Sequence, residues 1–376
     1  MRLGAVLLLL VAALAWWVWP PEESSSDGLR TASALRRGAA EAPGTPGAAT
    51  ATAPAGPLTP ARVDAFHGRL VVLRDLIDRD ALESLRAELV AAAAAEPEHG
   101  RLQRLLCEVH RLCGDLDGAL AAGRAATELL PDSSWAHLQH AKAVAEQMKV
   151  GGLFVAMREL GTYKDLMARA VELPPDEPGE ETLARVERIG YLVFAPGMAG
   201  GDLDEAERQS RALEAEDPRR ARMMLALAQA QDERLDDALA TCDGALADEP
   251  GDPSLLLVRA RLLQELERLT EADAAFAAVL EGPRSEKYYN ALYERSRLHL
   301  EHPELGGDPA ETLGWLQTYA DGRPYGDFLP GPAAAHWRMG LCHEALGNPA
   351  DARRCYEAAL AEDPDFEEAE DALDEL

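Results

Sequence analysis

Residues 336–366 read HWRMGLCHEALGNPADARRCYEAALAEDPDF and contain two amphipathic segments separated by Gly347-Asn348-Pro349. Glycine takes the left-handed conformation that ends a helix, asparagine caps the next helix, and proline is tolerated at the first helical position. The stretch therefore predicts a helical hairpin. Gly340 and Ala352 are expected where the two helices approach closely, and Pro364 is expected to stop the second helix.

The same punctuation recurs upstream, where Gly114-Asp115, Gly201-Asp202 and Gly307-Asp308 each precede a segment with helical spacing. A glycine stop followed by an acidic or amide cap is typical of two helices joined by a tight turn. We expect a small side chain to recur at one position of each second helix. The residues at this position are Ala119, Ala206, Ala238, Ala272, Ala310 and Ala352.

The interval between Ala119 and Ala206 is about twice as long as the others. It divides into two ordinary intervals if an additional hairpin with a long internal loop lies within it. The residues that predict this hairpin are Tyr163, Met167, Ala170 and Pro175.

These positions resemble those of the tetratricopeptide repeat family, whose unit is a helix pair of about 34 residues. The resemblance implies an all-α solenoid of about eight hairpins over residues 63–364, with residues 365–376 as an acidic capping helix. The best matches are Leu106, Cys107, Ala119, Ala126 and Pro131; Leu225, Ala226, Ala238, Ala245 and Pro250; Ala260, Ala272 and Phe276; and Gly340, Ala352, Tyr356, Ala359 and Pro364.

The composition of the 376-residue chain independently favours an all-α protein. Only 5% of the residues are aromatic, and alanine and leucine supply most of the apolar side chains. These residues form helices readily, whereas β-sheets favour aromatic and β-branched side chains. A net charge of −29 argues against double-stranded nucleic acid as a partner, because it repels phosphate. We therefore predict no nucleic-acid ligand.

Residues 3–19 read LGAVLLLLVAALAWWVW and are long enough, as a helix, to cross a bilayer. A cleaved signal peptide is the alternative, with Ala13-Leu14-Ala15 as its cleavage site. We favour an uncleaved transmembrane anchor over residues 1–19, because the bulky indoles of Trp16, Trp17 and Trp19 suit a membrane interface.

The charges around this segment predict its orientation. Arg2 precedes it, whereas Glu22, Glu23 and Asp27 follow it, so the amino end is expected in the cytoplasm. The body is then extracytoplasmic, and periplasmic if the source is bacterial. Residues 20–62, rich in proline, alanine and glycine, are expected to form a flexible linker.

Three segments exceed the length of an ordinary repeat and are predicted to be loops: residues 150–161, 193–201 and 321–332. Long loops on a regular scaffold often bind ligands. The second segment contains an Ala-Pro-Gly triplet and a Gly-Gly pair, and in this it is similar to bacterial envelope tetratricopeptide proteins. One hypothesis is therefore an accessory ligand-binding subunit of an envelope transport or assembly system. Its apolar pocket would be lined by Tyr163, Tyr191, Phe194 and Met198.

No motif indicates catalysis, a cofactor or a metal. Cys107, His110 and Cys113 cannot all face one ion from a single helix, because the outer pair is rotated too far apart. The glycine-rich loop before Asp202 lacks the Lys-Ser/Thr pair of a phosphate-binding loop. The five cysteines are too few for a disulfide framework. The repeat alignment places Cys342 and Cys355 on facing helices, either as a disulfide or as two small thiols.

The family resemblance implies that ligands lie in a concave groove made by the first helices. Arginines at its entrance would pair with a carboxylate or an acidic peptide. Alternatively, these arginines are ordinary helix positions paired with Glu108, Asp75 or Asp78. Trp337 is either an anchor for a partner or is packed against the next hairpin. The residues at these offsets are Arg74, Arg101, Arg104, Arg111, Met223, Leu227, Leu257, Gln264, Trp337, Leu341 and Glu344.

The sequence thus predicts a non-enzymatic scaffold that is tethered to a lipid bilayer by residues 3–19. Its expected partner is a protein or peptide of the cell envelope, recruited through the concave groove.

Overall fold

The computed structural model describes residues 58–76, 79–176, 181–322 and 329–376. Within these ranges the chain forms sixteen α-helices and no strand, which confirms the all-α prediction. The predicted anchor and nearly all of the predicted linker lie outside the described residues. None of the described helices combines the length and the apolarity needed to cross a membrane.

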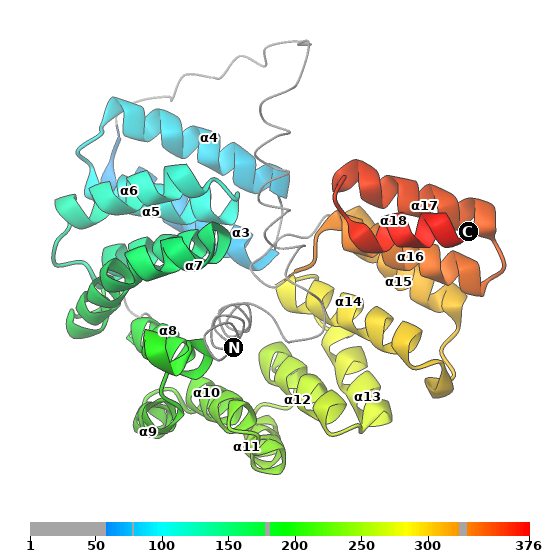
Figure 1. The fold of residues 1–376 in the computed structure, drawn as a ribbon. Helices are drawn as coiled ribbons and strands as arrows, with labels where there is room; N and C mark the ends of the chain where they lie inside the picture. The colour runs from blue at the N-terminus through cyan, green and yellow to red at the C-terminus, as the bar shows by residue number, and fades with distance from the viewer. Residues whose placement is uncertain (1–57, 77–78, 177–180, 323–328) are drawn as a thin grey trace, which may run out of the picture. The chain divides into compact units, whose positions relative to one another are not determined.

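Figure 1 shows the helices in chain order. The described chain divides into two compact units after Arg188. We call residues 58–188 the N-terminal unit and residues 189–376 the C-terminal unit. The N-terminal unit contains α3 (Pro60–Leu76), α4 (Arg79–Ala95), α5 (Gly100–Leu112), α6 (Leu116–Leu129), α7 (Ser134–Glu172) and the start of α8 (Leu183–Phe194).

The C-terminal unit contains the remaining helices, which follow one another as antiparallel pairs. They are α9 (Leu203–Leu213), α10 (Pro218–Gln231), α11 (Leu235–Asp248), α12 (Pro253–Glu265), α13 (Leu269–Leu280), α14 (Glu286–Glu301), α15 (Pro309–Gly322), α16 (Pro332–Ala345), α17 (Pro349–Glu362) and α18 (Glu367–Glu375). Two short 3₁₀ helices, η1 (Gly197–Ala199) and η2 (Pro303–Leu305), lie in connecting loops.

Helix α7 is itself a hairpin, because its backbone leaves the helical conformation at Gly152, where φ is 70° and ψ is −173°. The Ser134 hydroxyl donates to the carbonyl oxygen of Ala170 at 2.6 Å, so the two ends of α7 lie side by side. With α7 counted as two helices, the described chain contains eight successive helix pairs followed by α18, as predicted.

The additional hairpin predicted around Tyr163, Met167 and Ala170 is present, and these three side chains are buried. The long loop predicted at residues 150–161 is wrong, because these residues belong to α7. A single left-handed glycine reverses the chain and leaves the residues on both sides free to form helix. Likewise, residues 193–194 belong to α8 and residues 321–322 belong to α15, so the other two predicted loops are shorter than expected.

The predicted turn chemistry is present in the hairpins that match the repeat best. Gly114 and Gly347 have φ values of 76° and 73°, in the left-handed region. An Asp115 carboxylate oxygen accepts from the backbone N–H of Gly118 at 3.0 Å and caps α6. Asn348 occupies the cap position of α17 without a side-chain hydrogen bond, so only its placement was predicted correctly.

Two of the predicted glycine stops are displaced by one residue. Gly200 and Gly306 have positive φ values, rather than Gly201 and Gly307. Gly201 is instead needed for close packing, because a Cβ atom there would lie 1.7 Å from the Ala195 carbonyl oxygen.

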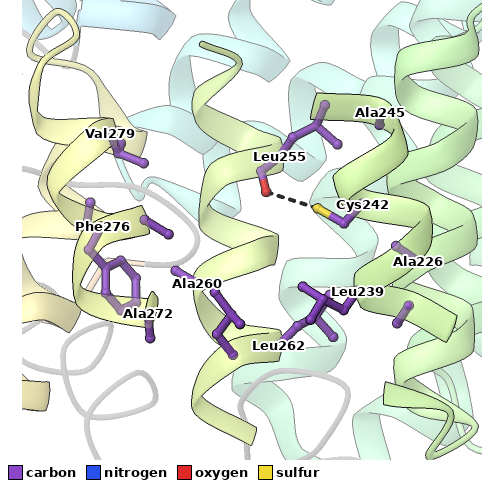
Figure 2. Close-up of a cluster of buried hydrophobic side chains, with 14 of the residues drawn as sticks. Ala226, Leu239, Cys242, Ala245, Leu255, Ala260, Leu262, Ala272, Phe276 and Val279 are labelled. Carbon is purple, nitrogen blue, oxygen red and sulfur yellow. Dashed lines mark hydrogen bonds between the residues drawn. The ribbon is translucent and has the colours of Figure 1, made fainter. Parts of the chain in front are cut away.

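The predicted close approach of paired helices is confirmed most clearly at Gly340 on α16. A Cβ atom at this position would lie 2.1 Å from Cε1 of Tyr356 on α17, and the Tyr356 side chain is fully buried. Figure 2 shows the equivalent contacts in the core of α10–α13, where Ala226, Ala260 and Ala272 are fully buried. The small residues therefore set the distance between helices.

The prediction for Ala310 is wrong. Ala310 is exposed, because α15 begins at Pro309 and the backbone N–H of Ala310 is capped by Asp308 at 2.9 Å. Two residues further on, Thr312 is only 2% exposed and occupies the buried position of this hairpin.

The close approach at Gly340 predicts how substitutions of glycine change the free energy of unfolding. Gly340→Ala should destabilise the chain by about 1–3 kcal/mol, because the buried Tyr356 ring cannot move away without disturbing the core. Gly314→Ala on α15 is the matched control, since a Cβ atom there meets nothing within 4 Å. It should stabilise by about 0.5–1 kcal/mol through helix propensity. Urea unfolding measures both changes, and equal effects of the two substitutions would contradict the packing argument.

In the N-terminal unit, His140 of α7 is buried against α6. A Cβ atom at Gly123 would lie 3.1 Å from the His140 Cα, and the His140 Nδ1 lies 3.3 Å from the Thr127 hydroxyl. Burial, together with the nearby charges of Arg124 and His137, lowers the pKa of His140 from 6.5 to about 4. The folded chain therefore keeps this imidazole neutral.

This burial predicts a pH dependence of stability. Between pH 6.5 and about 4 the unfolded chain binds a proton at His140 that the folded chain excludes, so stability falls as the pH falls. The His140→Gln variant should show a shallower loss over this range, by up to about 1.4 kcal/mol per pH unit. Unfolding free energies measured at several pH values test this, and parallel profiles for both proteins would refute it.

Candidate functional site

In the C-terminal unit, the first helices of successive hairpins contact one another, from α10 through α12 and α14 to α16. Side chains at equivalent positions of these helices therefore form rows. Arg261 on α12 and Arg338 on α16 both lie close enough to Glu294 on α14 to act on its charge. We call these residues, together with Arg297 on α14, the arginine cluster.

Glu294 lies at the centre of the arginine cluster. Its carboxylate is 3.0 Å from the Arg297 guanidinium and 3.8 Å from that of Arg261. Arg261 also donates to the Asn290 side-chain oxygen at 3.4 Å. Arg297 in turn lies 3.2 Å from Glu301. Three cations from three helices thus act on Glu294.

The electrostatics of Glu294 reflect this arrangement. Burial by itself raises the pKa of its carboxyl group, but the charges of Arg297, Arg261 and Arg338 and the hydrogen bond from Arg297 outweigh it. The resulting pKa lies below the usual value of a glutamate, so the carboxylate is ionised near neutral pH.

Arg338 is the buried member of the arginine cluster, at 3% exposure. Its guanidinium lies over the ring of Tyr293 at 4.7 Å and donates to the Tyr293 hydroxyl. The Tyr293 ring lies 5.3 Å from that of Tyr319 on α15, whose hydroxyl donates to the Pro330 carbonyl at 2.6 Å. Tyr293 on α14 therefore holds Arg338 in place, and Tyr319 on α15 packs against Tyr293.

The other two arginines of the cluster are more accessible. The Arg261 side chain is 47% exposed and that of Arg297 is 22% exposed. A guanidinium offers a planar fork of N–H donors that matches the two oxygens of a carboxylate. The arginine cluster therefore provides a surface with an excess of positive charge in an otherwise acidic chain, suited to an acidic side chain or a chain terminus.

The arginines expected at the groove entrance have structural partners in the N-terminal unit. Arg101 donates to Asp64 on α3 at 2.8 Å, and Arg111 donates to Glu146 on α7 at 2.8 Å. Arg104 is only 2% exposed, with its guanidinium 5.6 Å from the Trp135 ring. Arg74 lies in α3, with its side chain outside the described part.

Arg101 and Arg111 thus form ion pairs with neighbouring helices, whereas the alternative interpretation expected pairs with Glu108, Asp75 or Asp78. The side chains of Asp75 and Asp78 lie outside the described part. Arg104 is too deeply buried for its guanidinium to meet a ligand at the surface.

The expected contact residues of the C-terminal unit lie on its first helices and are mostly half-buried. Met223 and Leu257 pack against the core of α10–α13. The Trp337 ring lies 6.0 Å from Phe366, at the start of α18, and 4.8 Å from the Arg338 guanidinium. Packing against the next element is therefore present at Trp337. Leu227, Gln264 and Leu341 are partly buried, and exposed Glu344 accepts from the Tyr356 hydroxyl.

Sequence reasoning missed the residues that form the arginine cluster. Arg261 lies four residues after the expected Leu257, and Arg338 directly follows the expected Trp337. Arg261 could have been found by extending the face of Leu257, whereas Arg338 points away from the face of Trp337. Glu294 and Arg297 could not have been found, because the hairpin of α14 and α15 lacks the alanine that sets the register in its neighbours.

The residues of the expected apolar pocket are divided between the two units. Tyr163 lies in the N-terminal unit, whereas Tyr191 and Phe194 lie in the C-terminal unit. The Tyr191 hydroxyl donates to the Ala199 carbonyl oxygen, and burial raises its pKa to about 12. Met198 lies in η1, with its side chain outside the described part.

A shallow depression of about 390 Å³ lies elsewhere, among α9, α10 and α11. It is open to solvent, and Arg222 at its edge pairs with Glu214 at 2.7 Å. It lacks the enclosure expected of a small-molecule pocket.

The cysteines of the described chain are free thiols. Cys342 and Cys355 lie on α16 and α17, facing helices as expected, and the structure contains no bond between them. Burial raises the pKa of Cys107 to about 12, and His110 lies 2.7 Å from the Asp115 carboxylate. In the described ranges, no three histidine, cysteine or acidic side chains are placed to hold a metal ion.

Paired helices that contact one another in chain order define an α-helical repeat protein. Residues 198–253 and residues 333–366 match family models of the Tetratricopeptide repeat. The second match covers α16 and α17, the hairpin with the clearest turn and packing signals in the sequence.

A solved structure supports this fold. Yeast Tom70 is similar with a TM-score of 0.60 and 12% identity, over 98% of this chain and 69% of that chain. A human IFIT1 dimer with m7Gppp-AAAA gives a TM-score of 0.48 and 14% identity, over 75% of this chain and 68% of that chain. These identities indicate similarity of fold alone. Comparison with curated proteins found no match.

Removal of the central carboxylate should weaken the C-terminal unit. Glu294→Gln leaves Arg261 and Arg338 without this counter-charge and should lower the unfolding free energy by about 1–3 kcal/mol. Glu311→Gln, at an exposed position of α15, should change it by less than about 0.5 kcal/mol. Urea unfolding at pH 7 compares the two variants, and an unchanged Glu294→Gln protein would contradict the central role of this carboxylate.

Proposed function

We propose that this protein is a non-enzymatic scaffold that binds an acidic segment of a partner protein through the arginine cluster. The observation that carries the proposal is the convergence of Arg261, Arg297 and Arg338, from three successive first helices, on Glu294. A partner carboxylate can pair with the exposed fork of Arg261 without displacing a buried group.

The repeat architecture supports this role. Stacked hairpins bury their apolar faces against each other and leave a continuous row of first-helix side chains for binding. The matches to the tetratricopeptide repeat agree with a protein-interaction scaffold. The exclusion of nucleic acid remains a prediction from the net charge of −29.

We propose further that residues 3–19 anchor the chain in a membrane and that the body lies outside the cytoplasm. The support is the length and apolarity of this segment and the tryptophans at its end. A tethered scaffold would hold its partner at a raised effective concentration beside the bilayer. The anchor is tested separately, because a chain released from membranes by carbonate washing would contradict it.

The binding role makes a charge-specific prediction. The full chain should bind a fluorescent glutamate-rich peptide, and Arg261→Glu should weaken that binding by about tenfold, because it replaces attraction by repulsion. Higher salt should also weaken binding.

The matched control is Arg208→Glu on α9, whose side chain is 70% exposed and pairs with Glu205. It makes the same change of net charge away from the arginine cluster. Fluorescence anisotropy gives the dissociation constants, and equal weakening by the two substitutions would show that net charge, rather than the arginine cluster, decides binding.

A further inference from the structure

The turn of the α7 hairpin carries the most exposed large apolar side chains of the described chain. Phe154 is 80% exposed and Met157 is 71% exposed, whereas the next highest value is 55%, at Val72. Residues 150–157 read VGGLFVAM, without a charged side chain, in a protein of which 27% is charged. Adjacent exposed apolar groups of this size mark interaction surfaces in soluble parts of proteins. We call residues 150–157 the α7 tip.

The geometry makes the α7 tip a projection rather than a hollow. The chain reverses at Gly152, and the opposite end of the hairpin is closed by the hydrogen bond from Ser134 to Ala170. Phe154 and Met157 are three residues apart in the second half of α7, so they share one face. A Cβ atom at Gly151 would lie 2.5 Å from that of Val155, which shows how tightly the turn is packed.

The nearest charged side chains in sequence on either side of the α7 tip are basic, and Glu146 and Glu159 lie directly beyond them. Residues 147–158 include Lys149 and Arg158 and no acidic side chain, although the protein has a net charge of −29. The Arg158 side chain is 56% exposed and pairs with Glu159 at 2.7 Å. An apolar projection flanked by cations is complementary to an anionic bilayer surface, where rings enter the acyl region and cations meet headgroups.

We propose that the α7 tip inserts Phe154 and Met157 into the surface of an anionic phospholipid bilayer. A projecting apolar turn fits a deformable lipid phase, which needs no complementary pocket. The proposal rests on the proposed membrane anchor only for bringing the N-terminal unit close to lipid. Insertion would give the tethered chain a second contact with the bilayer, in the way that two weak signals together give stable attachment.

The test uses the full chain reconstituted in vesicles of phosphatidylglycerol and phosphatidylcholine. A photoreactive diazirine amino acid replaces Phe154, and in a matched control it replaces Leu346, a 38% exposed residue that follows α16. After irradiation, mass spectrometry identifies the adducts. We expect lipid adducts at position 154 at least about fivefold above position 346. Without phosphatidylglycerol the yield at position 154 should fall, because the cations lose their partners.

The Phe154→Ser, Met157→Ser double variant provides a second measurement. It removes surface side chains, so folding should be preserved, but hydrogen exchange at the α7 tip should lose the protection that anionic vesicles give the parent chain. Peptide adducts at position 154 would indicate a protein pocket or a second copy and would overturn the proposal. So would equal labelling at both positions. A chain that stays with the vesicles but gives no adduct at 154 overturns insertion and leaves the anchor standing, whereas a chain absent from the vesicles overturns both.

Discussion

The fold depends on the close approach of two helices at each small residue. At Gly340 there is no room for even one additional carbon beside the Tyr356 ring. Fully buried alanines occupy the equivalent contacts at Ala238, Ala272 and Ala352. Helices that approach this closely gain dispersion contacts along their length, which compensates for the scarcity of large aromatic side chains. Since the described cysteines are free, this packing has no support from disulfides.

The same constraint explains which parts of the fold the sequence could predict. A left-handed glycine, a cap and an alanine leave a readable pattern, and so the hairpins at Gly114 and Gly347 were predicted with their turns. The α7 hairpin was predicted only in part, because two adjacent glycines at 151 and 152 read as a loop. Glu233 and Glu267 show the converse, since both adopt positive φ at turns where no glycine marks the sequence. Packing of the flanking helices holds these turns in a conformation that glutamate alone disfavours.

The candidate site was harder to predict than the fold, for a physical reason. An arginine in a helix has no periodic signature that separates an ion pair with a neighbouring helix from a free binding group. Arg101 and Arg111 hold helices together through Asp64 and Glu146. Arg261 differs because its nearest carboxylate is shared with other arginines. That difference depends on the register of α14 relative to α12 and α16. This register could not be predicted from the sequence, because the α14–α15 hairpin lacks the alanine that marks it in the other hairpins.

A cluster with excess positive charge can attract an acidic partner even in a chain with a net charge of −29. At physiological salt the Debye length is about 8 Å, so distant carboxylates contribute little to the potential at Arg261. Helix α11 carries four aspartates and no basic residue, but it is the second helix of its pair, whereas the arginine cluster lies on first helices. The charges nearest to Arg261 therefore determine whether an acidic partner is attracted. Among them, Glu294 is held ionised by three guanidinium groups. Glu294 keeps Arg338 compatible with burial, and the more exposed fork of Arg261 remains accessible to a partner carboxylate.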